Sequence, residues 1–388
     1  MSDRKRIGLA MAGGGVEGAV YEIGTLCALE DAIVGFKACD MDMYIGVSAG
    51  ALISSHLVNH VSPRDMSLAI LSHLDGVNPI TPEILYNPNL KEVKDRLLQL
   101  PGKFLDVVKA YTSDMKDNSL LGSLAEFSEL LPNGIFDNST LEEYLRENFS
   151  MEGRTNDFRN LTTKLRIVAV DVDSGKTIRF GEKGFDHIPI SKAVQASSAL
   201  PGVYTPVEIE DKFYVDGVAK RTIHASTAFN DNIKFVIGIN PIVPLDNDKT
   251  HEGFGSLNEK GLPNILSQTF RMMIHSRMKA GLKGYATKYP DTDVILFEPP
   301  ATDYRMFFNN IFSYSTRKEV CEHAYQLTMK DIKKRKDELL PILQKYGYSL
   351  NEEVLNQTEF KLYKEKVGTD RERFQSAMSR IDAVLESL

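Results

Sequence analysis

The sequence predicts an α/β fold with a mainly parallel central sheet. Two observations lead to this prediction. Short apolar runs alternate along the chain with segments of helix length, and strands joined by helical crossovers pair in parallel. Glycine- and serine-containing motifs also follow two of these runs directly, as in α/β enzymes, which place ligands at the ends of their strands. The 388 residues, 42% of them hydrophobic, suffice for a sizeable core.

Six apolar runs have the length and composition of buried strands. The first ends in a glycine cluster, and the second ends in the sequence Gly46-Val47-Ser48. In chain order, the runs occupy residues 6–12, 41–48, 165–172, 212–217, 234–240 and 293–299. We expect one strand at each run and helices between them.

Three segments do not follow this alternation. Residues 76–135 form a long insertion whose stretch 90–111 is amphipathic, and it is a candidate lid. Residues 304–316 are unusually aromatic for a linker. Residues 317–388 are charged and helical in pattern, with helix breaks expected at Pro341 and near Gly347. The chain is therefore divided into a catalytic domain, 1–316, and a C-terminal helical extension, 317–388.

Composition limits the partners and the location. The formal net charge is −7, so no overall basic field favours nucleic acid, and any contact with a membrane surface must be local and transient. Cys27, Cys39 and Cys321 are odd in number and lack metal-ligand spacing, which favours free thiols in a reducing, cytoplasmic compartment. No apolar stretch reaches the length of a spanning helix.

The glycine cluster at residues 13–15 has two interpretations. Together with Gly18 it fits the G-x-G-x-x-G pattern of dinucleotide-binding loops. A run of backbone N–H groups after a strand can instead stabilise an oxyanion. A dinucleotide site requires an acidic residue at the end of the second strand. Here Asp40 and Asp42 precede that strand and Ser48 stands at its end, so the oxyanion interpretation is favoured.

The pattern G-x-S-x-G occupies residues 46–50, at the expected junction of a strand and a helix. Gly46 and Gly50 would allow a sharp turn that exposes the Ser48 hydroxyl above the helix N-terminus. The pattern alone is weak, because glycine and serine are common residues. Its place at the carboxyl end of a strand makes Ser48 the candidate nucleophile.

A serine nucleophile needs a base to remove its proton, and histidine is the usual one. None of the eight histidines lies in a recognisable catalytic context. His56 and His60 have i, i+4 spacing, but Leu57 stands where the zinc-protease pattern H-E-x-x-H has glutamate. Both histidines are therefore expected on a helix surface, and no metal site is predicted.

Asp216 is the alternative base. It closes the expected strand 212–217 and precedes Gly217, which gives the backbone freedom to turn. An aspartate before glycine can also be a plain turn residue. The resulting hypothesis is a dyad of Ser48 and Asp216.

Four segments, in this order, resemble the patatin-like phospholipase family: AGGGVEG (12–18), GVSAG (46–50), QASSALPGVYTPV (195–207) and YVDG (214–217). The segment 168–180 is similar to the strand and hairpin that precede the third motif. The resemblance covers residues 6–300 and implies a three-layer α/β/α sandwich without a cofactor. It implies Ser48 as nucleophile and Asp216 as its partner. The resemblance implies that the amides of Gly13, Gly14 and Gly15 form the oxyanion hole. During attack by Ser48 on an ester, we expect the amide of Ala49 to stabilise the oxyanion as well.

Two positions depart from the family pattern. Glu17 occupies the arginine position of G-G-G-x-R-G, and Val218 replaces a small residue after Asp216-Gly217. A carboxylate at position 17 reverses the charge beside the glycine loop, removes a bidentate phosphate donor and would repel an anionic head group. Ester hydrolysis is expected to survive, because the loop amides remain, whereas an anionic phospholipid is less favoured as substrate.

The function expected from these residues is hydrolysis of lipid or lipid-like carboxylic esters, of the phospholipase A or lysophospholipase kind, through the dyad and the glycine loop. Two alternatives stay open. The chain could be a soluble ester or thioester hydrolase, or a non-catalytic lipid- or partner-binding protein on the same fold. The sequence does not determine the acyl-chain length, the positional specificity or the oligomeric state.

Overall fold

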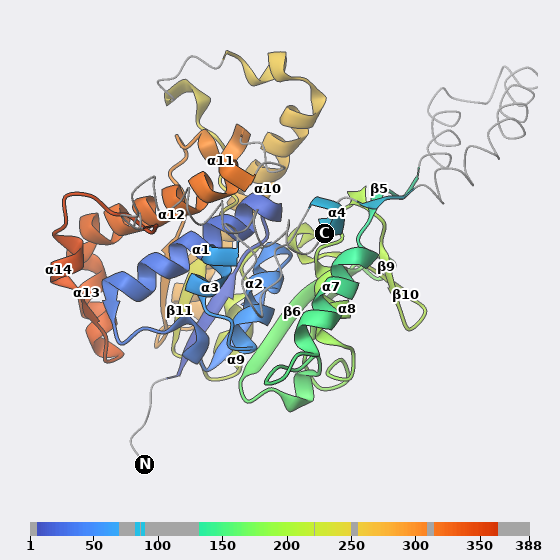
Figure 1. Cartoon of the computed structure of the whole chain (residues 1–388), viewed down its shortest axis with the longest axis horizontal. Helices are drawn as coiled ribbons and strands as arrows, with labels where there is room; N and C mark the ends of the chain where they lie inside the picture. The colour runs from blue at the N-terminus through green and yellow to red at the C-terminus, as the bar shows by residue number, and fades with distance from the viewer. Residues whose placement is uncertain are drawn as a thin grey trace, which may run out of the picture.

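The computed structural model describes residues 6–69, 82–85, 87–89, 132–220, 222–249, 255–308 and 314–363. Its centre is a mixed sheet of eight strands among these residues (Figure 1). In spatial order the strands are β12 (Asp293–Phe297), β11 (Phe235–Ile239), β1 (Ile7–Met11), β3 (Met43–Gly46), β6 (Lys164–Asp171), β10 (Lys212–Asp216) and β9 (Val207–Ile209), with β7 (Thr177–Phe180) paired to β6. All six apolar runs form strands, as predicted.

The sheet is parallel from β12 to β6 and antiparallel at the β10 edge. The reversal comes from a tight hairpin between β9 and β10. Its two turn residues, Glu210 and Asp211, have φ of 51° and 60°, the conformation that suits the twist of a two-residue hairpin. Asp216, at the end of β10, consequently pairs with Ala169 inside the longer strand β6. The segment YVDG (214–217) is thus brought against β6.

Both faces of the central strands are buried. In β1, Leu9 and Met11 join the core on one face, and Ala10 joins the core on the other. In β3, Tyr44 and Ile45 divide in the same way. Parallel strands covered on both faces have no polar side to present to water, which explains why the sequence shows unbroken apolar runs.

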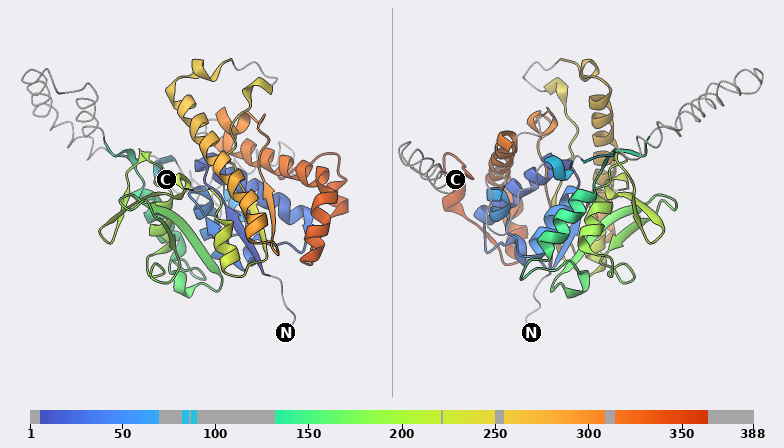
Figure 2. Two further views of the ribbon diagram at one scale, coloured as in Figure 1. Left: turned by 180° about the vertical axis from the view of Figure 1, so that it is seen from behind. Right: turned by 45° about the vertical axis from the view of Figure 1, so that its right-hand side comes forward.

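Helices cover the two faces and complete the predicted three-layer arrangement. The first face carries α1 (Gly15–Ala32), α2 (Ala49–Val58), α3 (Pro63–Ala69), α7 (Ser139–Phe149) and α8 (Ile190–Ser197). The opposite face carries α9 (Ala225–Asn230) and the long α10 (Leu262–Lys288), which crosses in front of the strands when the molecule is seen from behind (Figure 2, left).

The described part of the segment 317–388 packs directly on α1. It contains most of α12 (Tyr314–Lys334), then α13 (Lys336–Lys345), β13 (Ser349–Leu350) and α14 (Glu352–Leu355). α12 lies along α1 (Figure 1), and at Gly24 the two backbones are so close that a Cβ would lie 2.3 Å from the carbonyl oxygen of Cys321. β13 pairs with β2 (Ile33–Val34), directly after α1. The division at residue 316 stays a prediction.

The helix break expected at Pro341 is wrong. Pro341 lies inside α13, which continues to Lys345. Leu339 and Leu343 on either side of it are buried in the main core, and this packing outweighs the backbone hydrogen bond that a proline cannot donate. The chain does turn at Gly347, which has a φ of 85°.

The remaining short elements are α4 (Pro82–Leu85), α11 (Arg305–Phe308) and a small sheet of β4 (Asn87–Pro88), β5 (Gly134–Asp137) and β8 (Gly202–Tyr204). The candidate lid, 76–135, lies outside the described residues except for 82–85, 87–89 and 132–135.

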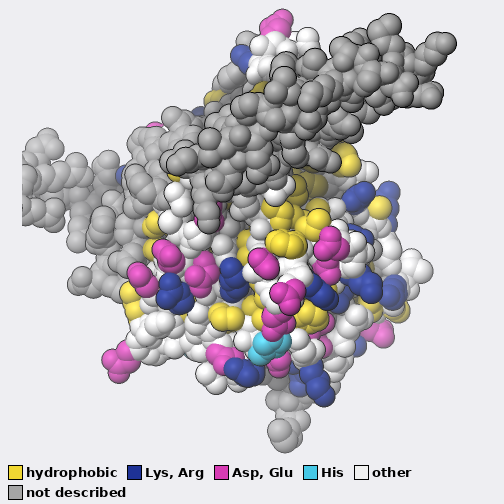
Figure 3. Space-filling view, turned by 90° about the vertical axis from the view of Figure 1, so that its right-hand side faces the viewer, with side chains coloured by type: hydrophobic (Ala, Val, Ile, Leu, Met, Phe, Trp, Pro, Cys, Tyr) yellow, Lys and Arg dark blue, Asp and Glu magenta, His cyan; other side chains and the backbone are white. Residues whose placement is uncertain are grey.

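No helix in the described ranges is long and apolar enough to cross a bilayer. On the face seen in Figure 3, acidic and basic side chains are interspersed.

Candidate active site

Ser48 lies on a strained turn between β3 and α2. Its backbone has φ 54° and ψ −117°, a left-handed conformation that residues with a Cβ rarely adopt. β3 ends at Gly46 and α2 begins at Ala49, so Ser48 occupies the junction predicted from the sequence. A strained strand-to-helix turn of this kind is what the predicted nucleophile elbow requires, because such a turn can present a serine hydroxyl beside the first N–H groups of the following helix.

The two glycines of the elbow are required by close backbone contacts. A Cβ at Gly46 would lie 2.4 Å from the carbonyl oxygen of Gly50, and a Cβ at Gly50 would lie 2.4 Å from the carbonyl oxygen of Met11. The N–H of Gly50 donates to the carbonyl of Ala12, at 3.0 Å. The elbow is therefore packed against the end of β1, where the glycine loop begins.

A serine from the third motif fixes the backbone of the elbow. The Ser48 N–H donates to Oγ of Ser197 at 2.9 Å, and this hydroxyl donates to the carbonyl of Val168 in β6 at 2.7 Å. Two residues further on, the carbonyl of Ala199 accepts the N–H of Asp216 at 2.9 Å. The end of α8 thus holds both members of the predicted dyad. Sequence reasoning gave Ser197 no role, although the third motif contains it.

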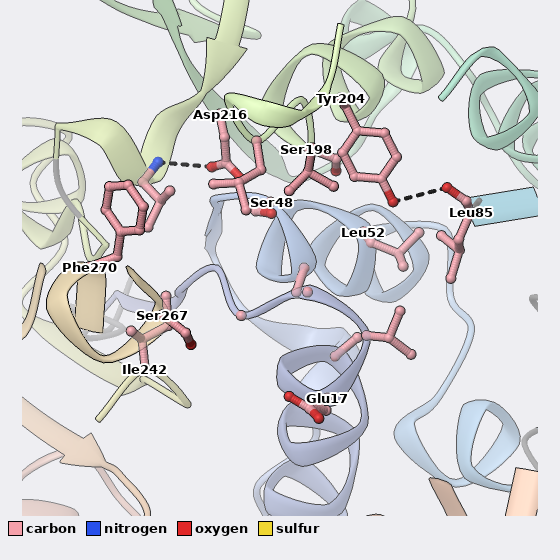
Figure 4. A pocket seen from close by; sticks show the side chains of 18 of the residues that line it. Glu17, Ser48, Leu52, Leu85, Ser198, Tyr204, Asp216, Ile242, Ser267 and Phe270 are labelled. Atoms are coloured by element: carbon pink, nitrogen blue, oxygen red, sulfur yellow. Dashed lines mark hydrogen bonds between the residues drawn. The ribbon is translucent and has the colours of Figure 1, made fainter. Parts of the chain in front are cut away.

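Asp216 is buried beside Ser48, with 2% of its surface exposed. Figure 4 shows the two side chains adjacent, with Oδ1 of Asp216 accepting the N–H of Val218 at 2.9 Å. Burial raises the pKa of the carboxyl to about 7, against the opposing effects of the Val218 N–H and the Ser48 hydroxyl. A carboxyl with this pKa can accept and return a proton near neutral pH.

The glycine loop borders the same space. Gly14 has φ 154°, and a Cβ there would lie 2.8 Å from Cα of Gly18, so only glycine fits this turn. Gly13 packs against Ser48, since a Cβ on it would lie 3.2 Å from that of the serine. The N–H groups of Gly13 and Gly14 donate to no acceptor within the described part of the chain. Gly15 and Ala49 are the first residues of α1 and α2, whose N-termini favour negative charge.

Ser48 and Asp216 open into a large, mainly apolar cavity of about 920 Å³. Figure 4 shows Ser267 and Phe270 of α10 on one side of it, and Leu52, Leu85 and Tyr204 on the other. A cavity of this size and character suits an acyl chain better than a nucleotide, which needs many polar contacts.

A family model described as patatin-like phospholipase matches residues 9–229, which is more than half of the chain. The chain belongs to the patatin-like phospholipase family. The match includes the glycine loop, the elbow, the third motif and Asp216, and the α/β architecture agrees with it.

Two solved structures resemble the chain weakly. VipD from Legionella pneumophila matches with a TM-score of 0.37 and 15% sequence identity, over 84% of this chain and 66% of VipD. Human GIVD cytosolic phospholipase A2, solved in complex with methyl gamma-linolenyl fluorophosphonate, matches with a TM-score of 0.33 and 11% identity, over 88% of this chain and 59% of the phospholipase. The chain spans less than two thirds of either protein. No curated protein matched the sequence.

Glu17, which departs from the patatin-like pattern, lines the cavity on α1 (Figure 4). Burial raises the pKa of its carboxyl to about 7, although the positive charge of Arg271 on α10 works in the opposite direction. Val218, the second departure, also lines the cavity, and it supports Asp216 through its backbone N–H rather than its side chain. Neither departure disturbs the elbow or the glycine loop. The electrostatic pair Glu17–Arg271 was not foreseen from the sequence.

The expectation that His56 lies on a helix surface is wrong. His56 is buried in α2 and lines the cavity. Its Nδ1 lies 2.8 Å from the carbonyl oxygen of Leu52, one turn earlier, and the ring packs edge-on against Phe149. Burial lowers the pKa of His56 to about 4, so the ring is neutral at physiological pH. His60 is exposed, as expected, but it lies in the turn after α2, which ends at Val58, and not on the helix. The described residues include no cluster of three potential metal ligands.

Proposed function

We propose that this patatin-like protein is a serine acyl hydrolase that cleaves carboxylic esters of lipids, with Ser48 as nucleophile and Asp216 as its base. The observation that carries the proposal is the strained Ser48 beside a buried carboxyl whose pKa is about 7, at the wall of an apolar cavity. Such a cavity would exclude water from an acyl chain while the ester lies at Ser48.

In the proposed reaction Asp216 accepts the Ser48 proton as the serine oxygen attacks the ester carbonyl. The amides of Gly13, Gly14, Gly15 and Ala49 would stabilise the tetrahedral oxyanion, each contributing about 3 kcal/mol. The proton then passes to the departing alcohol, which leaves an acyl group on Ser48. Water, deprotonated by the same carboxylate, attacks this acyl ester and frees the fatty acid and the serine.

The test is labelling of the purified protein by a fluorophosphonate probe, which reacts only with an activated serine. Three serines among the described residues line the cavity, Ser48, Ser198 and Ser267, so the chain offers matched controls. We expect labelling to vanish in Ser48→Ala and to persist in Ser198→Ala and Ser267→Ala. Turnover of para-nitrophenyl esters should fall at least about 10³-fold in Ser48→Ala only.

Other outcomes would support the alternatives. A folded wild-type protein that stays unlabelled, with and without lipid micelles, would contradict the proposal and favour a binding protein on this fold. Turnover confined to short acyl chains and thioesters would favour a soluble hydrolase. We expect turnover to rise with acyl-chain length, because the cavity wall is mainly apolar.

A further inference from the structure

One polar side chain interrupts the apolar wall that α2 gives to the cavity. Four residues of α2 line the cavity, namely Ala49, Leu52, Ile53 and His56, and His56 alone among them has a polar side chain. They recur at the spacing of one helix face, and Leu52 points into the cavity in Figure 4. The cavity therefore follows α2 from Ser48 to His56.

Among the described residues, only one ring nitrogen of His56 has a hydrogen-bond partner. Nδ1 lies 2.8 Å from the carbonyl oxygen of Leu52, and nothing in the described chain donates to Nε2. Burial lowers the pKa of the ring to about 4, so the ring is neutral and carries one proton. A carbonyl oxygen can only accept a hydrogen bond, so this proton is on Nδ1. Nε2 is therefore an acceptor without a donor.

Nε2 is open to the cavity. His56 is 5% exposed, yet Nε2 is not among the fully enclosed side-chain atoms that lack a partner in the described part of the chain. Phe149 packs against the ring, with 5.3 Å between the ring centroids, and the ring lines the cavity. An unsubstituted hydrocarbon chain placed here would leave the acceptor unpaired, which costs free energy. A chain that carries a hydroxyl donor would avoid this cost.

The position of His56 specifies where such a donor would lie. His56 follows Ser48 by eight positions, and eight residues correspond to about 12 Å along a helix axis. An extended chain of single bonds advances about 1.2 Å per bond, so roughly ten bonds cover this distance. A hydroxyl that meets Nε2 would therefore lie at about the tenth carbon of an acyl chain whose ester is at Ser48.

We propose that His56 selects acyl chains that carry a hydroxyl group near the middle of the chain, with Nε2 accepting the hydrogen bond from this hydroxyl. The inference rests on the proposed function and names the acyl group that the site takes, a hydroxylated fatty acyl ester. The ester would lie at Ser48 and the hydrocarbon along α2. A site with a buried acceptor favours the chain that pairs with it over the chain that leaves it unpaired.

The test compares three esters of equal chain length in the same neutral detergent micelles: the para-nitrophenyl esters of 10-hydroxystearate, 3-hydroxystearate and stearate. The readout is the ratio of kcat/KM values, hydroxylated ester over stearate ester. We expect His56→Phe to lower the ratio for the 10-hydroxy ester about fivefold, the effect of one neutral hydrogen bond. The ratio for the 3-hydroxy ester should not change, because its hydroxyl lies beside the ester and far from Nε2.

The choice of variants separates the hydrogen bond from the packing. Phenylalanine keeps a ring against Phe149 and removes both nitrogens. His56→Leu removes the same acceptor with a smaller side chain and should give the same loss, so the result does not depend on one variant folding. Leu52→Met is the matched control, because it alters the same face of α2 one turn earlier without changing a hydrogen-bonding group. Its ratios should match those of the wild type.

The unsubstituted ester gives a result of opposite sign. Turnover of the stearate ester should rise in His56→Phe, because its chain no longer covers an unpaired nitrogen. A loss with one ester and a gain with the other cannot come from general damage to the site. If the 10-hydroxy ratio in folded His56→Phe and His56→Leu stays within twofold of the wild-type value, the proposal is overturned.

Equilibrium binding separates this proposal from the proposed function. Displacement of a fluorescent fatty acid by free 10-hydroxystearic or stearic acid measures recognition of the chain without turnover. The ratio of the two affinities should fall about fivefold in His56→Phe. A wild-type protein that hydrolyses no ester but shows this fall would contradict the proposed hydrolase and support the hydroxyl site. Turnover of the esters with an affinity ratio equal in wild type and variant would support the hydrolase and overturn the hydroxyl site.

Discussion

At the scale of single residues, the candidate site depends on a few short polar contacts in an apolar setting. Ser197 connects the Ser48 N–H to β6, and Ala199 connects the N–H of Asp216 to the end of α8. The positions of the candidate nucleophile and the candidate base therefore depend on the same three-residue segment, 197–199. Burial then determines the chemistry of Asp216, because a desolvated carboxylate binds a proton more tightly.

The activity should depend on pH through Asp216. Its pKa is raised to about 7, and only the carboxylate can accept the Ser48 proton, so ester turnover should rise as the pH increases through about 7 and fall below it. The measurement is kcat/KM of a neutral para-nitrophenyl ester between pH 5 and 9.

Glu17 provides the control for this pH profile, since its pKa is also about 7. In Glu17→Gln the acidic limb should remain, because Asp216 still titrates. A limb that disappears in this variant would assign the ionisation to Glu17 and contradict the role given to Asp216.

At the scale of the elements, α10 is the unusual helix. Leu262, Leu266, Phe270 and Met273 recur at helical spacing, line the cavity and are nonetheless exposed, Phe270 by 57%. One face of α10 packs on the sheet through Met278 and Tyr285, whereas this stripe borders the open side of the cavity. Apolar side chains at a cavity mouth are suited to contact with a long acyl chain.

Phe270→Ser should lower kcat/KM for long-chain para-nitrophenyl esters about tenfold and leave short-chain esters nearly unchanged, because only a long chain would reach this side chain. Met272→Ser is the matched control. Met272 is 47% exposed on the same helix and does not line the cavity, so its chain-length profile should equal that of the wild type. Equal losses for short and long esters would show that Phe270 does not contact the acyl chain.

At the scale of the whole molecule, α1 is a central helix rather than a surface one. The sheet covers one side of it and α12 covers the other, and hydrogen bonds from Tyr325 to Asp31 and from Thr328 to Thr25 connect the two helices. Every residue of α1 from Gly18 to Leu29 is buried, and a helix that is buried all round requires this kind of double cover. The C-terminal helices therefore help to hold the helix that begins at the glycine loop.

Gly24→Ala should destabilise the protein by about 1–3 kcal/mol, because the new methyl group meets the backbone of α12 and forces the helices apart. Thermal unfolding measures the effect. Gly281→Ala in α10 is the control, because no atom lies within 4 Å of the new Cβ. Its melting temperature should equal that of the wild type, or exceed it because alanine has a higher helix propensity than glycine. A Gly24→Ala protein as stable as the wild type would contradict the close packing of α1 and α12.

The local features were predictable from the sequence. The six strands follow from apolar runs, and the elbow at Ser48 follows from a glycine pattern that permits one sharp turn. Asp216 could be singled out by its place at a strand end. These features depend on residues close together in the chain, whose conformational preferences are nearly independent of the rest of the fold.

The sequence by itself determined the fold class, the family resemblance and the candidate dyad. Only the tertiary structure decided which distant residues interact: His56 lines the cavity, and Arg271 interacts electrostatically with Glu17. It also decided that Pro341 lies within a helix, because the leucines on either side of it are buried. The physical reason is that burial and electrostatic pairing depend on the packing of elements far apart in the chain. Local periodicity identifies an apolar or charged face but not the surface that covers it.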